Sequence, residues 1–269
     1  MYKKVLCNGS GNTFVLIHKI DFGTINLSPK QIQRLCLYKR AHGTDGLLLI
    51  STIKAAQYLL NYYNCDGTWE SLCINGSLCS ARYMKDHFIV DKQFTFKAGD
   101  GIHTVRSLNN MLEVSICPPK KTKENINIAG FTGSLIDSGA KHFCIIVNKL
   151  DESMPTTLGP IIRNDYIFKP GGVNVNFIKI INKNTIEVFT YEKGVEKFMQ
   201  SCGSGAAAAV YYAYEFLKNK RDSLLQIQSP CTIITPGGRF TARFNGWSDF
   251  YISGPTEISP PENLDVASL

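Results

Sequence analysis

The sequence lacks an apolar run long enough to cross a membrane. A transmembrane helix needs about 20 consecutive apolar residues, whereas the longest runs here are the length of a strand. Cys73 and Cys79 have no histidine at ligand spacing, and the interval between them is not a zinc spacing. No Lys-Ser or Lys-Thr pair follows Gly203-Ser204-Gly205, as a phosphate-binding loop would require. These absences argue against a membrane protein, a metal site and a P-loop nucleotide site.

Acidic residues are outnumbered, with 22 Asp and Glu against 29 Lys and Arg and a net charge of +7. The sequence shows no nucleic-acid-binding motif and no platform of basic and aromatic residues, so we expect no nucleic-acid partner. The first residues turn polar too soon for a secretory signal peptide. The nine cysteines are odd in number and match no compact disulfide framework. Together these features predict a cytoplasmic protein with reduced thiols.

The first part of the chain is predicted to form strands and two helices. β-Prone runs flank a glycine-rich turn at residues 8–12, and Ser28-Pro29 is typical of a helix start. Residues 52–63 mix helical and strand patterns, and we favour a strand that enters a turn at Asn64. The expected strands are 3–6, 13–18, 47–51, 88–90, 93–97, 104–108 and 111–116, and the expected helices are 29–40 and 75–86.

Residues 117–125 combine two prolines with a run of charges, which indicates a linker. Beyond it we expect a short helix within 154–163, a turn at 170–172, a buried helix from Ala206 onward and a loose segment at 260–263. The expected strands of this part are 143–147, 173–181, 185–190, 224–228, 232–234, 240–244 and 249–252.

The order of strands, helix and strands occurs twice, which suggests a duplication. We therefore predict an α+β fold of two pseudo-symmetric lobes, each a mostly antiparallel sheet wrapped around one central helix. The predicted lobes are residues 1–117 and 118–255. A tail follows at 256–269 and is expected either to be loose or to return to the first lobe.

Two segments about half a chain apart share one plan, in which a polar turn leads to a cysteine, small residues and a helix. Cys73 precedes Ile74-Asn75-Gly76, and Cys202 precedes Gly203-Ser204-Gly205. Helix N-termini bind anions and lower the pKa of a nearby thiol. Each segment could therefore seat a carboxylate beside a thiol. The pair suggests a two-base racemase, in which one thiolate removes the Cα proton of an amino acid and the other thiol protonates the opposite face.

The ordinary alternative is that these cysteines are small buried hydrophobic residues, as free cysteines usually are. That interpretation suits the other seven, at positions 7, 36, 65, 79, 117, 144 and 231, which have no matched setting. Cys73 and Cys202 stand apart because both precede a helix at its N-terminus. A binding protein without activity also stays open, although it would have little reason to keep both thiols.

At these residues the chain resembles the diaminopimelate epimerase family, and the resemblance covers nearly the whole chain in order. Residues 73–79 and 201–206 are similar to the two catalytic cysteine motifs of that family. The other similar segments are 11–14, 45–48, 64–67, 174–177, 191–195, 236–238 and 253–255. The resemblance implies an isomerase that interconverts LL- and meso-2,6-diaminopimelate, for lysine and peptidoglycan synthesis, without pyridoxal phosphate or any other cofactor.

The resemblance also implies a site in the cleft between the lobes and a role for each matching residue. Cys73 and Cys202 would be the base and the acid. The reacting carboxylate would lie on Ile74, Asn75, Gly76, Gly203 and Ser204, the reacting amino group on Asn12 and Glu192, and the distal end on Asn64, Asn174 and Lys193. The asparagines have an ordinary alternative as turn formers. Diaminopimelate would be the small-molecule partner, and a homodimer stays open.

Four departures from the family pattern touch substrate recognition. Lys193 stands where the family has arginine, and lysine cannot grip a carboxylate with two parallel hydrogen bonds. Ala140 replaces a substrate-contacting asparagine, Trp69 and Ile74 are bulkier than usual, and the segment from Glu192 to Cys202 is one residue longer. No departure removes a catalytic thiol. A related racemase for another amino acid is therefore the second reading.

Overall fold

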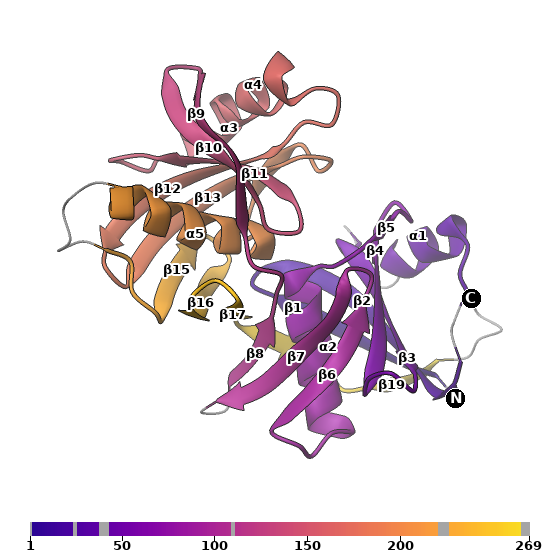
Figure 1. The fold of residues 1–269 in the computed structure, drawn as a ribbon. Helices are drawn as coiled ribbons and strands as arrows, with labels where there is room; N and C mark the ends of the chain where they lie inside the picture. The colour runs from indigo at the N-terminus through magenta and orange to yellow at the C-terminus, as the bar shows by residue number, and fades with distance from the viewer. Residues whose placement is uncertain (1, 24–25, 38–42, 109–110, 220–225, 265–269) are drawn as a thin grey trace. The chain divides into compact units, whose positions relative to one another are not determined.

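The computed structural model describes residues 2–23, 26–37, 43–108, 111–219 and 226–264 of the chain. The chain forms two compact units (Figure 1). Unit 1 comprises Met1–Ser115 and Ser253–Leu269, and unit 2 comprises Ile116–Ile252. Among the described residues, no helix has the length and apolar character needed to span a membrane. The lobe bounds inferred from the sequence stay a prediction.

Unit 1 is a curved sheet around the helix α2 (Ile74–His87), with the short helix α1 (Pro29–Leu37) on the other side of the strands. Its strands are β1 (Tyr2–Gly9), β2 (Asn12–Phe22), β3 (Gly46–Thr52), β4 (Tyr58–Asn64), β5 (Trp69–Glu70), β6 (Gln93–Ala98), β7 (Gly101–Leu108), β8 (Met111–Ser115), β18 (Thr256–Ile258) and β19 (Glu262–Leu264). Strand pairs β1–β2 and β3–β4 are antiparallel, whereas β2–β3 and β4–β6 are parallel.

Unit 2 repeats this plan around the helix α5 (Gly203–Asn219). Its strands are β9 (Lys120–Ile128), β10 (Phe131–Asp137), β11 (Lys141–Ile146), β12 (Asn174–Asn182), β13 (Thr185–Glu192), β14 (Lys197–Met199), β15 (Cys231–Thr235), β16 (Gly238–Asn245) and β17 (Asp249–Ser253). The pairs β10–β11 and β12–β13 are antiparallel, and β11–β12 and β13–β15 are parallel, as in unit 1. The matching order of pairings is the duplication that the sequence predicted.

Alternation along the strands separates two layers of core in each unit, because successive side chains point to opposite faces of a sheet. In β12, Val175 and Phe177 join the apolar cluster that also contains Ile162 of the short helix α4 (Gly159–Arg163). Helix α3 (Ser153–Thr157) and the 3₁₀ turn Tyr166–Phe168 flank α4. Asn176 of β12, on the opposite face, hydrogen-bonds the backbone of α5 at Gly205. The face toward α5 therefore carries polar groups at the start of that helix.

Two expected elements differ from those in the structure. Residues 88–90, expected to be a strand, end helix α2, where the Phe88 amide bonds the Met84 carbonyl. The Lys85 ammonium also bonds three carbonyls of residues 89–91, which holds this segment around the helix end. The expected linker 117–125 is also wrong beyond residue 119, because its charged residues form the largely exposed strand β9, which pairs with β10. Strand β10 itself was not expected.

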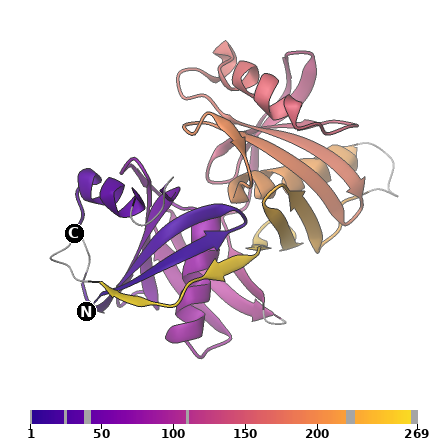
Figure 2. The same cartoon turned by 180° about the vertical axis from the view of Figure 1, so that it is seen from behind.

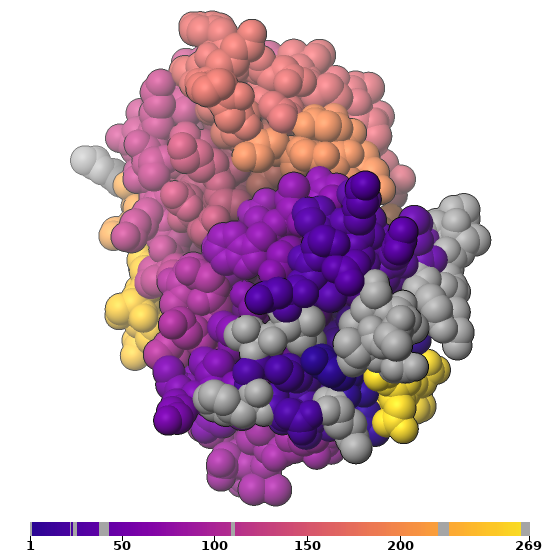
Figure 3. Space-filling model, turned by 90° about the vertical axis from the view of Figure 1, so that its right-hand side faces the viewer, coloured from indigo at the N-terminus to yellow at the C-terminus, as the bar shows by residue number. Residues whose placement is uncertain are grey.

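The segment 260–263 is not loose, contrary to the expectation. In strand β19, Leu264 pairs with Tyr2 and Glu262 pairs with Lys4 of β1, and the Lys4 ammonium lies 3.3 Å from the Glu262 carboxylate. Figure 2 shows this yellow segment running along the indigo strands, and Figure 3 shows both colours together on one surface. Pairing with the edge of β1 orders residues 262–264, a contact that local composition does not reveal.

The remaining expected elements are present with shifted ends, except for the strand expected at 224–228. The mixed stretch 52–63 becomes strand β4 only from Tyr58 onward. Residues 226–228 carry no strand, although the Gln228 amide bonds the Lys183 carbonyl, and residues 224–225 lie outside the described part. Helix α1 is described to Leu37, and positions 38–40 of its expected range also lie outside the described part.

Candidate active site

Cys73 is the N-cap residue of helix α2, at the end of an extended connection from β5. Its backbone is extended (φ −126°, ψ 116°), and its Sγ accepts a hydrogen bond from the Gly76 amide at 3.4 Å. The Cys73 carbonyl accepts the first helical bond, from Ser77. The thiol also lies 3.9 Å from Oδ1 of Asn12, the first residue of β2. The fold therefore brings Asn12, Cys73 and the first turn of α2 together.

The small residue Gly76 allows this helix end to press against the sheet. A Cβ atom at Gly76 would lie 2.6 Å from the Leu48 side chain of β3. Gly9 of β1 also approaches the helix closely, since a Cβ atom there would lie 2.9 Å from the Asn75 carbonyl. Ile74 and Asn75 are themselves buried. The N-terminal turn of α2 is thus held by close packing on two strands.

Cys202 occupies the equivalent place before helix α5. Its Sγ accepts a hydrogen bond from the Gly205 amide at 3.3 Å, and its carbonyl accepts the Ala206 amide. The Ser204 hydroxyl lies 3.4 Å from the same sulfur. Both thiols therefore bond an amide three residues ahead, at the positively polarised end of a buried helix. The amides of the first helical turn have no partner within a helix, and a helix N-terminus favours a nearby negative charge.

A buried polar network fixes the start of α5. His142 of β11 lies 3.0 Å from the Ser204 hydroxyl through Nε2 and 3.2 Å from Asn176 Oδ1 through Nδ1. Asn176 Nδ2 donates to the Gly205 carbonyl, and Thr190 donates to Asn176 Oδ1, so the oxygen of this amide faces the imidazole. We therefore assign the proton to Nδ1 of His142, and Nε2 accepts from Ser204.

Burial shifts the pKa of both the His142 ring and the Cys202 thiol. Complete burial lowers the pKa of His142 to about 4, so the ring is neutral at physiological pH. Burial also raises the pKa of Cys202 well above its ordinary value, the Glu192 carboxylate raises it further, and the Gly205 amide opposes the shift. The expectation of a thiol pKa lowered towards neutral is wrong for Cys202, because desolvation and a nearby negative charge outweigh the helix terminus.

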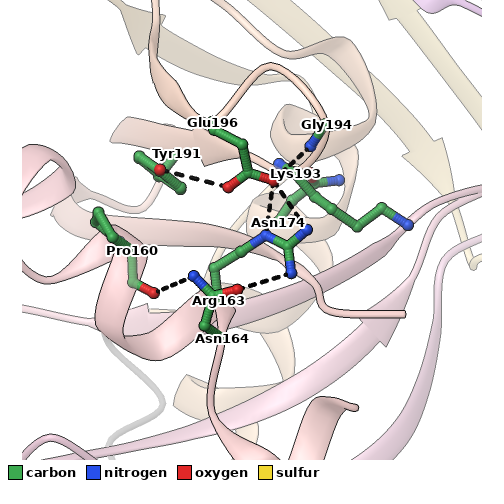
Figure 4. A network of polar contacts seen from close by, with 8 residues as sticks. All are labelled: Pro160, Arg163, Asn164, Asn174, Tyr191, Lys193, Gly194 and Glu196. Atoms are coloured by element: carbon green, nitrogen blue, oxygen red, sulfur yellow. Dashed lines mark hydrogen bonds and ion pairs between the residues drawn. The ribbon is translucent and has the colours of Figure 1, made fainter. Parts of the chain in front are cut away.

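The residues expected at the distal end of the substrate lie in two different settings. Asn174 Oδ1 accepts the Lys193 amide at 2.9 Å, which joins the loop after β13 to strand β12 (Figure 4). Asn64, in contrast, is held within its own turn. Its Oδ1 accepts the Tyr62 hydroxyl at 2.7 Å, and its Nδ2 donates to Thr68 at 3.0 Å. These are the contacts of a turn former.

Comparison with known proteins places these motifs in one family. The family model for diaminopimelate epimerase matches residues 134–246. A protein named diaminopimelate epimerase from Chlorobaculum tepidum is 28% identical over 254 residues, which cover 92% of this chain and 95% of that protein. Another of that name, from Aquifex aeolicus, is 30% identical over 220 residues, which cover 77% of this chain and 79% of that protein. The chain belongs to the diaminopimelate epimerase family.

Solved structures agree on the fold. The structure of a probable proline racemase from Agrobacterium radiobacter superposes with a TM-score of 0.69 and covers 99% of this chain and 93% of that chain, at 13% sequence identity. At this identity the likeness concerns the fold alone. The predicted α+β fold of two pseudo-symmetric lobes is confirmed, as is the family resemblance inferred from the cysteine motifs.

Several residues of this diaminopimelate epimerase family member were not singled out from sequence. His142 was not among the candidate residues, whereas the structure places it between Asn176 and Ser204. Arg163 and Glu196 form an ion pair beside Lys193, and neither was a candidate site residue in the sequence analysis. The sequence signal for His142 was its position directly before the expected strand 143–147. Within the described residues, no cluster of three His, Cys, Asp or Glu side chains is arranged to hold a metal.

Proposed function

We propose that the protein is a diaminopimelate epimerase, which interconverts LL- and meso-2,6-diaminopimelate by proton transfer at one Cα. The observation that carries this proposal is the repeated placement of a thiol. In each unit a cysteine bonds the amide three residues ahead at the start of a buried helix. Membership of the diaminopimelate epimerase family supports the same substrate.

The helix N-termini supply the electrostatic part of the reaction. Removal of the Cα proton moves charge onto the carboxylate oxygens, and preorganised amides stabilise that charge more than they stabilise the substrate. We assign the amides of Ile74, Asn75 and Gly76 in unit 1 to this seat, together with those of Gly203 and Ser204 in unit 2. Loss of one such donor typically slows a reaction roughly 100- to 1000-fold.

The two thiols divide the proton transfer. Cys202 keeps its proton in the substrate-free protein, because burial and the Glu192 charge raise its pKa. It is therefore the acid in one direction of the reaction, while Cys73, as a thiolate, removes the proton from the other face of Cα. Because the His142 proton is assigned to Nδ1, the Ser204 hydroxyl donates to Nε2 of His142 and its proton is directed away from the Cys202 sulfur. In the reverse direction the roles are exchanged.

The remaining proposed contacts hold the two ends of the substrate. Asn12 and Glu192 bind the amino group at the reacting Cα, and Asn64, Asn174 and Lys193 bind the distal amino-acid group. Lys193 offers a point charge, whereas the planar guanidinium of an arginine would bind a carboxylate more strongly through two parallel hydrogen bonds. We therefore propose that distal carboxylate binding depends more on the loop as a whole than on this one side chain.

Hydrogen exchange at Cα tests the proposal directly. Reduced protein is incubated in deuterated water with LL-diaminopimelate, and both label at Cα and formation of the meso isomer are followed. We expect Cys73→Ala and Cys202→Ala each to slow the reaction by roughly 100- to 10,000-fold. Cys231→Ala, which removes a buried thiol from β15, is the matched control and should retain activity. Undiminished exchange in either catalytic variant would contradict the two-thiol mechanism.

A racemase for another amino acid is the second candidate, favoured by Ala140 and Lys193 at expected substrate contacts. The same exchange assay with a panel of amino acids separates the two. Exchange with another amino acid and none with diaminopimelate would replace the substrate and leave the mechanism intact. We further propose a cytoplasmic location, which fits nine cysteines that are all thiols. A homodimer stays a prediction, to be measured by light scattering.

A further inference from the structure

An ion pair anchors the loop that follows strand β13. The guanidinium of Arg163, from helix α4, binds one oxygen of Glu196 through two nitrogens, at 2.8 and 2.9 Å. Figure 4 shows the arginine reaching from its helix to the loop that carries Lys193 and Gly194. A planar guanidinium that donates twice to a carboxylate is held more firmly in orientation than a single-point contact.

Glu196 organises the loop from within. The same Glu196 oxygen accepts the Gly194 amide at 3.0 Å, and its other oxygen accepts the Tyr191 hydroxyl at 3.4 Å. The Glu196 amide closes the loop on the Glu192 carbonyl at 2.8 Å, with a left-handed backbone at Glu196 (φ 56°). Partial burial acts to raise the pKa of Glu196, but the hydrogen bonds from Gly194 and Arg163 outweigh it and lower that pKa. The carboxylate is therefore charged at neutral pH.

Arg163 is itself fixed at its base. Its Nη1 donates to the Asn164 side chain, and Asn164 in turn donates to the Pro160 carbonyl. Gly172 leaves room for the guanidinium, since a Cβ atom there would lie 2.0 Å from Nη1. The Arg163 guanidinium thus occupies space that a side chain at residue 172 would fill, and this packing restricts its position.

The anchored loop leads to the proposed substrate contacts. Its first residue, Lys193, bonds Asn174 through its amide, whereas Glu192 is still held in the β13–β14 ladder opposite Lys197. The ion pair therefore acts most directly on the loop, whereas the ladder with β14 holds Glu192 independently of the pair. The loop also lies in the segment that is one residue longer than the family pattern, where additional anchoring is needed to define one conformation.

We infer that Arg163 and Glu196 form a positioning pair that presents Lys193 and Asn174 to the distal, non-reacting end of the substrate. The inference rests on the proposed function, since it names the end of the substrate that the loop holds. The two residues act through the loop and do not touch the reacting atoms. Their loss should weaken binding of the substrate and its transition state equally, which raises KM and leaves kcat unchanged.

Steady-state kinetics with LL-diaminopimelate test the pair. We expect Arg163→Gln and Glu196→Gln each to raise KM on the order of tenfold, with kcat within twofold of the native value. The double variant should resemble either single variant, because both changes remove one shared interaction. Arg163→Lys should recover part of the lost affinity. The control is Lys121→Gln, which breaks the exposed pair with Glu124 on β9 and should leave both constants unchanged.

Hydrogen exchange of the loop amides keeps this test separate from the test of function. In Arg163→Gln the amides of Lys193 and Gly194 should exchange faster, while those of α5 are unchanged. If the native protein is active and Arg163→Gln keeps its KM, the pair has no positioning role, and the function stands. If kcat falls and KM does not, the pair acts on the chemistry and the inference is wrong. If the native protein is inactive with diaminopimelate, the function fails, and unchanged loop exchange would then refute the pair by itself.

Discussion

The neutral state of His142 should make unit 2 sensitive to acid. The ring is completely buried, with a pKa of about 4 in the folded protein, whereas an unfolded histidine has a pKa of about 6.5. Below pH 6.5 the unfolded chain binds a proton that the folded chain excludes. Stability is therefore fully present above pH 6.5 and is lost as the pH falls towards 4.

The size of the loss follows from the difference between the two pKa values. The full difference between the two pKa values corresponds to about 3–4 kcal/mol, at about 1.4 kcal/mol for each pKa unit. Between pH 7 and pH 4.5 the expected part is about 2 kcal/mol. Removal of the imidazole in His142→Gln should abolish this component. The variant will be less stable than the native protein at pH 7, and the gap between them should shrink by about 2 kcal/mol at pH 4.5.

Urea unfolding at several pH values measures this gap. Of the two tryptophans, Trp69 lies in unit 1 and Trp247 in unit 2, so a Trp69→Phe background makes fluorescence report on unit 2 alone. Comparison of native and His142→Gln proteins in that background cancels carboxylates that titrate in both, such as Glu196. A stability gap that is the same at pH 7 and pH 4.5 would show that the ring is not buried in its neutral form.

Three further predictions concern the thiols, the helix end and the loop. Glu192→Gln should lower the pKa of Cys202 and speed its alkylation at pH 8 by roughly threefold to tenfold, because each pKa unit changes the thiolate fraction about tenfold. Mass spectrometry of the Cys202 peptide measures this rate. An unchanged rate would exclude the Glu192 charge as a cause of the raised pKa. Gly76→Ala should destabilise unit 1 by about 1–3 kcal/mol in a thermal melting experiment, since its Cβ atom would overlap the Leu48 side chain. The control Gly171→Ala, which has open space around its Cβ atom, should leave the melting unchanged. Lys193→Arg should lower KM for diaminopimelate about threefold, since a planar guanidinium binds a carboxylate better than an ammonium; a raised KM would place this side chain away from the distal carboxylate.

The position of both thiols at helix N-termini could be predicted from the sequence, because this position depends on local chain geometry. A cysteine followed by small residues and a helix predicts an N-cap thiol, and both Cys73 and Cys202 have that geometry. The strand and helix order also predicted the duplication, since alternation and helical periodicity are properties of short segments. Local patterns failed at 88–90 and 260–263, where a lysine around a helix end and a pairing with β1 decided the structure.

Tertiary structure decided what surrounds each thiol. The position of Cys202 at a helix N-terminus follows from the sequence alone, and this position predicted a lowered thiol pKa. Only the folded chain showed that the sulfur is buried beside the Glu192 carboxylate, which reverses the direction of the shift. The same holds for His142 and for Arg163, whose partners lie on other elements, more than 30 residues away in the chain. Caps and periodicity act over a few residues, whereas desolvation and ion pairing depend on which distant segments are packed together.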